Sequence, residues 1–381
     1  MFGFTEDMTE KQELVRKFCE EWIYPNLAEI DAGTCCPDYI WEEWCKIPGF
    51  ASPCAPKFTG GEEMPFNTCL AMWEEFGKAD VGVATGFGSN NLGSFPILLT
   101  GTEEQQKEHF GNLLKGKFGA FGLTEKGAGS DAGAVATEAR KEGEYYILNG
   151  DKCYITTSGK AIESKSTLAI CASTDKSLGS KGLTMFLIPG DTPGLTAVKE
   201  EDKMGIRGSA TYELIFTDCR IPKENMLGKQ GEGFKIAMHT LDGGRIGIAA
   251  QALGLAEGAL ERTIEYVKER KQFGRAIGQF QNTQFQLADM ATKVQAAQYM
   301  VYRAAVAKAT QKTYSVEAAM AKLYAAEVAM EVTTKAVQLH GGYGYIREYD
   351  VERMMRDAKI TEIYEGTSEV QRMVISSALL K

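Results

Sequence analysis

Hydrophobic residues recur with a helical period at both ends of the chain and with a strand-like pattern in between. Up to about residue 116, apolar side chains fall three and four positions apart, as Leu14, Phe18 and Trp22 do, which predicts amphipathic helices. Thr102 and Gln105 match a capping box at the start of one of these helices. From Gly233 to the C-terminus the helical period returns and is stronger, so a second helical region is expected.

The middle of the chain, between about Phe118 and Gly228, shows a different pattern. Short runs rich in β-forming residues are separated by turn-like pairs that contain glycine. These runs are residues 145–148, 167–170, 183–188 and 212–216. They predict an all-β insert of roughly a hundred residues. The order helical, β, helical predicts three domains, at residues 1–117, 118–229 and 230–381.

Composition narrows the class of protein. The 381 residues are 44% hydrophobic and 24% charged, which is typical of a globular protein. The net charge of −9 and the scattered basic residues do not favour binding to nucleic acid. No apolar run is long enough to cross a membrane, and no signal segment opens the chain, so a cytoplasmic location is expected. The nine cysteines form no C-x-x-C pair, which favours reduced thiols.

Several familiar catalytic signatures are absent from the sequence. The three histidines have no metal-ligand spacing, so no metal site is expected. There is no G-x-S-x-G elbow, no phosphate loop ending in Gly-Lys-Ser/Thr, and no G-x-G-x-x-G between a strand and a helix. Any chemistry would therefore depend on carboxylates and a bound cofactor.

Three polar segments that contain glycine stand out, at residues 121–131, 338–345 and 363–369. Each has a structural interpretation. The first is also typical of a crossover loop, and the second of a glycine helix cap. In the third, Thr367 or Ser368 could cap the last helix, with Glu369 favouring its N-terminus. The residues alone leave these interpretations open.

Together, and in this order around a central β insert, the three segments resemble the acyl-CoA dehydrogenase family. The likeness covers essentially the whole chain and is closest to the short-chain, butyryl-CoA type of anaerobic bacteria. Further matching stretches are residues 203–207, 224–228, 233–238, 241–245 and 355–360. The resemblance implies an α+β multidomain fold: an N-terminal helical domain, a central β-sandwich or barrel-like domain and a C-terminal four-helix bundle.

The resemblance also implies an activity. In this family FAD-dependent α,β-dehydrogenation converts an acyl-CoA thioester to the trans-2-enoyl-CoA, or the reverse. Glu365 matches the base that removes the α-proton, while flavin N5 takes the β-hydride. Branched-chain and long-chain relatives carry a glutamate base at the position of Gly244, which has no side chain here. An electron-transferring flavoprotein is the implied partner, and a homotetramer built as a dimer of dimers is the implied assembly.

Individual contacts follow from the same resemblance. The implied substrate contacts are Ser130, Asp242, Arg245 and Gly366. Arg270, Gln281 and residues 338–342 would reach the flavin of a neighbouring subunit. Tyr154 stands where the family often has Trp. The implied flavin contacts are Phe121, Leu123, Thr124, Gly129, Ser130, Tyr154, Ile155, Thr156, Arg270, Phe273, Gln281, Gln338, Gly341, Gly342, Thr367 and Glu369.

The acyl group is less well defined by the resemblance. The helix expected to line its pocket, near residues 83–96, has no Arg or Lys, which disfavours a glutaryl-type substrate. Ser89, Asn90 and Asn91 could line a pocket for a polar, cyclic or aryl acyl group, or face the helix surface. An acyl-CoA oxidase on the same scaffold and a non-catalytic helical binding protein are the alternatives in other classes.

Overall fold

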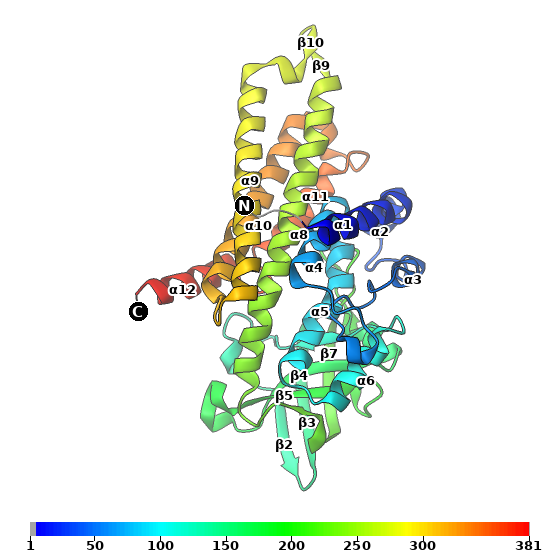
Figure 1. Ribbon diagram of the computed structural model, residues 1–381, viewed down its shortest axis with the longest axis vertical. Coiled ribbons are helices and arrows are strands. Elements are labelled where there is room, and N and C mark those ends of the chain that lie inside the picture. Colours follow the sequence, from blue (N-terminus) through cyan, green and yellow to red (C-terminus); the bar gives the residue numbers. More distant parts are fainter. Residues whose placement is uncertain (1–4, 381) are drawn as a thin grey trace.

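The computed structural model describes residues 5–380, in which helices are followed by a β-sheet and then by further helices (Figure 1). This order confirms the architecture expected from the hydrophobic pattern. Residues 1–4 and 381, which the first and third expected domains include, lie outside the described residues.

The N-terminal helices pack around a cluster of aromatic side chains. Trp44 is fully buried, and its ring centroid lies 5.0 Å from those of both Phe18 and Phe76. The predicted capping box is present, because the Thr102 and Gln105 side chains each accept a hydrogen bond from the other residue's N–H. The helices are α1 (Glu6–Phe18), α2 (Leu27–Ala32), α3 (Asp38–Lys46), α4 (Phe66–Ala79), α5 (Val81–Thr100) and α6 (Glu103–Leu113).

The middle of the chain forms one sheet in the order β6-β7-β3-β2-β4-β5-β8, with β1 paired in parallel to β4. Its strands are β1 (Ala120–Gly122), β2 (Glu138–Glu142), β3 (Tyr145–Thr156), β4 (Thr167–Ser173), β5 (Leu183–Pro189), β6 (Leu195–Glu200), β7 (Thr211–Pro222) and β8 (Met226–Leu227); the short α7 (Ser158–Glu163) follows β3. Every residue of β4 is buried. Its alternate side chains enter two separate clusters, one with Leu168 and Ile170 and the other with Ala169 and Cys171. The second cluster includes Ile236, so this face of the sheet packs against the first turn of the long helix that follows.

The C-terminal region is a bundle of long helices (Figure 1). Its helices are α8 (Gly233–Glu269), α9 (Gln281–Thr310), α10 (Ser315–His340), α11 (Val351–Thr361) and α12 (Ser368–Leu379), and the strands β9 (Lys271–Gln272) and β10 (Arg275–Ala276) form the turn between α8 and α9. Helix α8 also packs closely on α4. A Cβ at Gly254 would lie 1.8 Å from the carbonyl oxygen of Glu74, so only glycine permits this approach.

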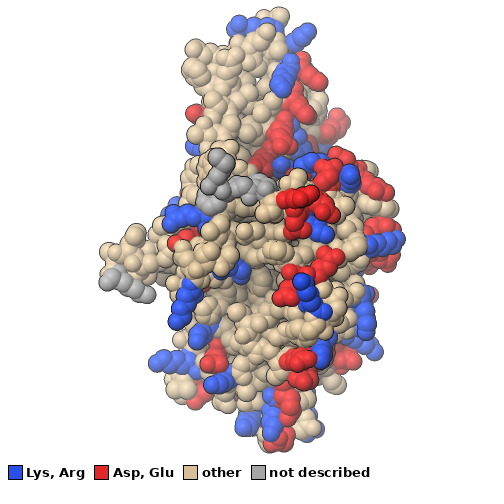
Figure 2. Space-filling model, in the orientation of Figure 1, with Lys and Arg blue, Asp and Glu red and all other residues tan. Residues whose placement is uncertain are grey.

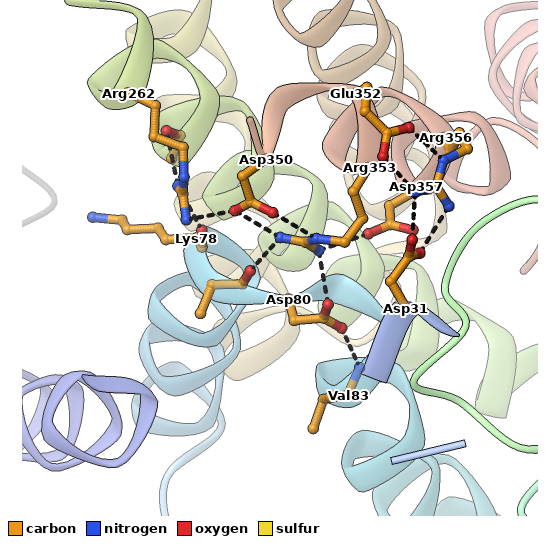
Figure 3. Close-up of polar contacts among 12 residues, drawn as sticks. Asp31, Lys78, Asp80, Val83, Arg262, Asp350, Glu352, Arg353, Arg356 and Asp357 are labelled. Carbon is orange, nitrogen blue, oxygen red and sulfur yellow. Dashed lines mark hydrogen bonds and ion pairs between the residues drawn. The ribbon is translucent and has the colours of Figure 1, made fainter. Parts of the chain in front are cut away.

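Helix α11 is anchored to the N-terminal helices by the buried Arg353 (Figure 3). All of its guanidinium N–H groups are engaged, at 2.7–3.0 Å, with Asp80, Asp350, Asp357 and the carbonyl oxygen of Ala79. We refer to Arg353, Asp80, Asp350 and Asp357 as the Arg353 network. It fixes α11 at the junction of α4 and α5, which matters because α11 leads directly into residues 363–369.

On the surface, Lys and Arg side chains lie scattered among Asp and Glu over the face that Figure 2 shows. Within residues 5–380, no helix is both long and apolar enough to cross a membrane. The same residues include no group of three or more His, Cys, Asp or Glu side chains placed to hold a metal ion. The nine cysteines are all free thiols.

Candidate active site

A cavity of about 110 Å³ lies among α4, α5 and α8 and is bordered by residues 364–365. One enclosed water needs about 10–15 Å³ of such space, so the cavity has room for a short chain of several heavy atoms. Helix α5, which contains the residues expected to line the acyl pocket, contributes one wall of this cavity. The cavity is lined by Cys54, Phe66, Cys69, Leu70, Trp73, Thr85, Gly88, Ser89, Asn91, Leu92, Phe95, Thr156, Gly243, Gly244, Gly247, Ile248, Gln251, Tyr364 and Glu365.

Glu365 enters this cavity from a loop with an unusual backbone. Its φ is +54° and that of Gly366 is +89°, both in the left-handed region that few residues other than glycine adopt. Three side chains hold the loop by its carbonyl oxygens. Arg245 Nε (3.3 Å) and Gln371 Nε2 (3.1 Å) donate to Glu365, and Lys322 Nζ (2.7 Å) donates to Gly366. Such a strained conformation persists only where its surroundings fix it, and here it directs the carboxylate into the cavity.

The Glu365 carboxylate has a buried oxygen, Oε2, without a hydrogen-bond partner among the described residues. Burial raises the pKa of Glu365 to about 7, although the positive charges of Arg245 and Lys322 oppose the shift. A Cβ at Gly244 would lie only 2.6 Å from Oε2, so a larger residue there would compete with the carboxylate for space. A carboxylate with a free oxygen and a pKa near neutrality is suited to general-base catalysis.

Asp242 and Arg245, expected to contact substrate, are buried against the loop that carries Glu365. Arg245 Nη1 pairs with Asp242 Oδ1 at 2.8 Å, and the Ser315 hydroxyl donates to the other oxygen of Asp242. Because Arg245 also donates to the Glu365 carbonyl oxygen, the pair supports the position of the candidate base.

One group of expected flavin contacts lies beside the cavity. The Cys153 N–H donates to the carbonyl oxygen of Thr124 at 3.0 Å, which places residues 121–130 next to residues 154–156. Thr156 lines the cavity itself. The other members of this group are Phe121, Leu123, Gly129, Ser130, Tyr154 and Ile155, of which Leu123 and Ile155 are buried.

The backbone of this group is open to a ligand. A Cβ at Gly127 or Gly129 would meet no atom within 4 Å, and the Tyr154 side chain is 67% exposed. Across the Glu365 loop, Thr367 caps α12 by accepting from the Val370 N–H, and Glu369 is exposed in its first turn. Exposed N–H groups beside an aromatic side chain suit a group with a planar ring and phosphates, so these residues fit a flavin dinucleotide.

The remaining expected flavin contacts lie in a second group near the turn between α8 and α9. Arg270, Gln338, Gly341 and Gly342 line one hollow there. Phe273, in the turn, is 93% exposed, and Gln281 is the first residue of α9. Along α8, Arg270 is about 25 residues from Arg245, which at about 1.5 Å per residue is roughly 37 Å. One bound dinucleotide cannot reach both groups of the same chain.

The sequence analysis did not identify several residues that shape the site. Lys322 is fully buried, which lowers its pKa to about 8, and its charge faces Glu365. Gln371 is also fully buried, and the Tyr364 hydroxyl is a buried group without a partner among the described residues. Lys322 carried a signal, as a single cation in an alanine-rich stretch of a helix. Thr85 donates a hydrogen bond to Gln251 at 3.1 Å in the cavity wall, and no sequence pattern pointed to either residue.

Comparison with known proteins covers the whole chain. The family models for the acyl-CoA dehydrogenase N-terminal, middle and C-terminal domains match residues 5–117, 120–219 and 231–380. A short-chain-specific acyl-CoA dehydrogenase of Clostridium acetobutylicum is 47% identical, over 100% of both chains. The CarC subunit of the caffeyl-CoA reductase-Etf complex of Acetobacterium woodii is 45% identical, over 99% of both chains. The solved structure of butyryl-CoA dehydrogenase from Megasphaera elsdenii superimposes with a TM-score of 0.96 at 45% identity, over 100% of both chains.

Proposed function

Since this chain belongs to the acyl-CoA dehydrogenase family of flavin-dependent oxidoreductases, we propose that it uses FAD to interconvert a short-chain acyl-CoA and its trans-2-enoyl-CoA, with Glu365 as the base. One observation carries this proposal: Glu365 lines a largely apolar cavity, and one oxygen of its carboxylate has no partner among the described residues. A thioester α-proton is weakly acidic, so its removal needs a base of raised pKa and a donor to the developing oxyanion.

The chain's own residues supply both requirements. Burial gives the Glu365 carboxylate a pKa of about 7, and its entry into the cavity allows it to receive the α-proton. The Glu365 N–H donates no hydrogen bond within residues 5–380, so it is free to donate to the thioester oxygen. Bound FAD would supply the acceptor for the β-hydride, which no side chain can provide. Arg245 and Gln371 hold the loop that carries the carboxylate.

The two groups of expected flavin contacts support an assembly of more than one chain. Residues 121–130 and 154–156, with Thr367 and Glu369, would bind the flavin beside Glu365. The group around Arg270, roughly 37 Å away along α8, would complete the flavin site of a neighbouring subunit, as in the homotetramer that the resemblance implies. Exposed apolar side chains on α9 and α12, among them Phe285, Met373 and Leu379, are available for such contacts.

The size of the cavity supports a short acyl group. Trp73 and Gln251 are part of its wall, and the volume of about 110 Å³ leaves little room for a long chain. The reaction can run in either direction, and the printed name of the Acetobacterium woodii relative describes a reductase in complex with Etf. We therefore propose an electron-transferring flavoprotein as the electron partner.

The test is an anaerobic titration of the purified protein, followed by its visible spectrum. The protein should be yellow, and butyryl-CoA or hexanoyl-CoA should bleach the flavin absorbance more completely than glutaryl-, phenylpropionyl- or cyclohexanecarboxyl-CoA. Fast reoxidation by air would favour an acyl-CoA oxidase instead. A colourless protein that takes up no FAD would overturn the proposal.

A further inference from the structure

Three consecutive polar residues of α5 have different surroundings. The Ser89 hydroxyl bonds to the Gly86 carbonyl oxygen (2.7 Å) and to the Thr157 hydroxyl (2.8 Å). Asn90 donates to a backbone carbonyl at 3.3 Å and accepts from a backbone N–H at 2.8 Å. Ser89 and Asn90 therefore tie α5 to neighbouring segments, and their polarity is explained by the fold.

Asn91 has no such explanation. Its side chain lines the cavity and is only 8% exposed. Its Oδ1 accepts a hydrogen bond from the Cys54 thiol at 3.2 Å, whereas its Nδ2 donates none to any residue that the structure describes. Burial raises the pKa of Cys54 to about 11, which keeps the thiol protonated and able to donate. The carbonyl end of the amide is therefore occupied, and the N–H₂ end is left to the cavity.

The position of Asn91 places this free donor close to the base. Asn91 lies three residues after Gly88 and four before Phe95, so these residues share one face of α5, and Leu92 borders the same cavity. Leu92 is 3.0 Å from the Cβ position of Gly244, which in turn is 2.6 Å from the Glu365 carboxylate. A substrate carbon held at Glu365 would therefore have its next few atoms within the part of the cavity that Asn91 lines.

Several other polar groups in the wall are paired with the protein or fully buried. The hydroxyl oxygen of Tyr364 has no partner among the described residues, but it is itself fully buried. Thr85 donates to Gln251, and Gln251 donates to the Ala84 carbonyl oxygen at 3.3 Å, so these two side chains are paired with the protein. Most of the remaining lining is apolar, including Phe66, Leu70 and Trp73. A buried amide donor in such a wall is unfavourable unless a ligand accepts its hydrogen bond.

We propose that Asn91 is a specificity-determining residue whose Nδ2–H₂ donates a hydrogen bond to an oxygen on the acyl group. The preferred substrates are then short acyl-CoA thioesters that carry a hydroxyl, ether or carbonyl oxygen beyond the two reacting carbons. This inference rests on the proposed function, because it takes the cavity as the acyl site.

The experiment compares matched substrates that differ by one oxygen in place of one carbon. The first pair is 4-hydroxybutyryl-CoA and pentanoyl-CoA, and the second is 4-methoxybutyryl-CoA and hexanoyl-CoA. For each pair, the ratio of kcat/KM values, oxygenated over alkyl, is measured with the flavin-loaded wild-type protein and its variants. The ratio cancels effects of a variant on folding, flavin content and general activity.

Asn91→Leu, which removes the donor, should lower both ratios about tenfold or more. Asn91→Asp keeps the size but presents an acceptor, so it should lower the ratio for the ether, which can only accept, and not for the hydroxyl, which can donate. Thr85→Val is the matched control, because Thr85 is engaged with Gln251, and it should leave both ratios within about twofold of wild type.

The inference is wrong if both ratios stay within twofold of wild type in the two Asn91 variants, or if Thr85→Val changes them as much. Failure of the proposed function gives a different result, since no acyl-CoA of either pair would then reduce the flavin.

Discussion

Two buried carboxylates near α11 have similar acidity and opposite surroundings. Burial raises the pKa of Asp357, within the helix, to about 7, and that of Glu365, in the loop that follows, to the same value. Asp357 Oδ2 accepts from Arg353 at 3.0 Å, and its Oδ1 accepts from the Ile206 N–H at 2.5 Å. Glu365 Oε2 has no partner among residues 5–380, and the Glu365 side chain lines a cavity. A raised pKa therefore does not identify a catalytic base; a free oxygen that a substrate can reach does.

The contrast between Asp357 and Glu365 also shows how helix α11 supports the loop that carries Glu365. The Arg353 network (Figure 3) joins α11 to the junction of α4 and α5. Asp357 additionally holds Ile206, a β-branched residue with φ of +45°. With every hydrogen bond of Arg353 made within the protein, this region provides a rigid support. The Glu365 loop begins where that support ends, and it leaves its carboxylate free for chemistry.

The comparison is tested most directly by Glu365→Gln. This variant should bind FAD normally and lose about two to four decades of turnover, because the amide cannot accept the α-proton. Flavin reduction by butyryl-CoA in a stopped-flow experiment measures the loss. Glu362→Gln, outside the cavity, is the control and should retain wild-type turnover. Near-normal reduction in Glu365→Gln would show that another group is the base.

Arg353→Met should affect stability rather than chemistry. It leaves the carboxylates of Asp80 and Asp357 buried without their cation, and breaking a buried ion pair in this way costs about 3–5 kcal/mol. Urea unfolding measures the change in the free energy of unfolding. The control, Arg356→Met, removes a less buried guanidinium that pairs with Asp31 and Glu352, and should cost about 1 kcal/mol. Equal losses in the two variants would contradict a special role for the Arg353 network.

The pH dependence of activity should follow Glu365. Its deprotonated form is the active one, so kcat/KM should rise with pH, level off above about 7, and fall about tenfold per pH unit below that value. Asp357→Asn should leave this profile in place, because Asp357 touches no substrate. A profile that is flat between pH 5.5 and 8 would contradict the raised pKa of Glu365.

The sequence predicts the regular parts of this molecule well, because their signals are local. The capping box at Thr102 and the strand over residues 167–170 depend on neighbouring residues and were predictable. The position of Glu365 was implied by family resemblance, but its supports were not. Lys322 and Gln371 act on backbone carbonyl oxygens, and Arg353 joins segments more than 270 residues apart in sequence. The spacing of hydrophobic residues along the chain does not predict contacts between distant segments, so only the folded structure shows them.

The smallest expected effect is on the pH dependence of the free energy of unfolding, to which Asp357 should contribute through its raised pKa. Because the folded-state pKa of Asp357 lies above its unfolded value of about 4, the folded protein holds more protons between about pH 4 and 7. The contribution of Asp357 to the free energy of unfolding therefore decreases as pH rises through this range. Asp357→Asn removes that decrease, so between pH 6 and 8 the variant should gain about 1.4 kcal/mol relative to wild type, on top of any constant offset. Urea unfolding at several pH values measures this gain. A difference between variant and wild type that does not change with pH would mean that Asp357 stays ionised in the folded protein, and that Arg353 fully offsets the cost of its burial.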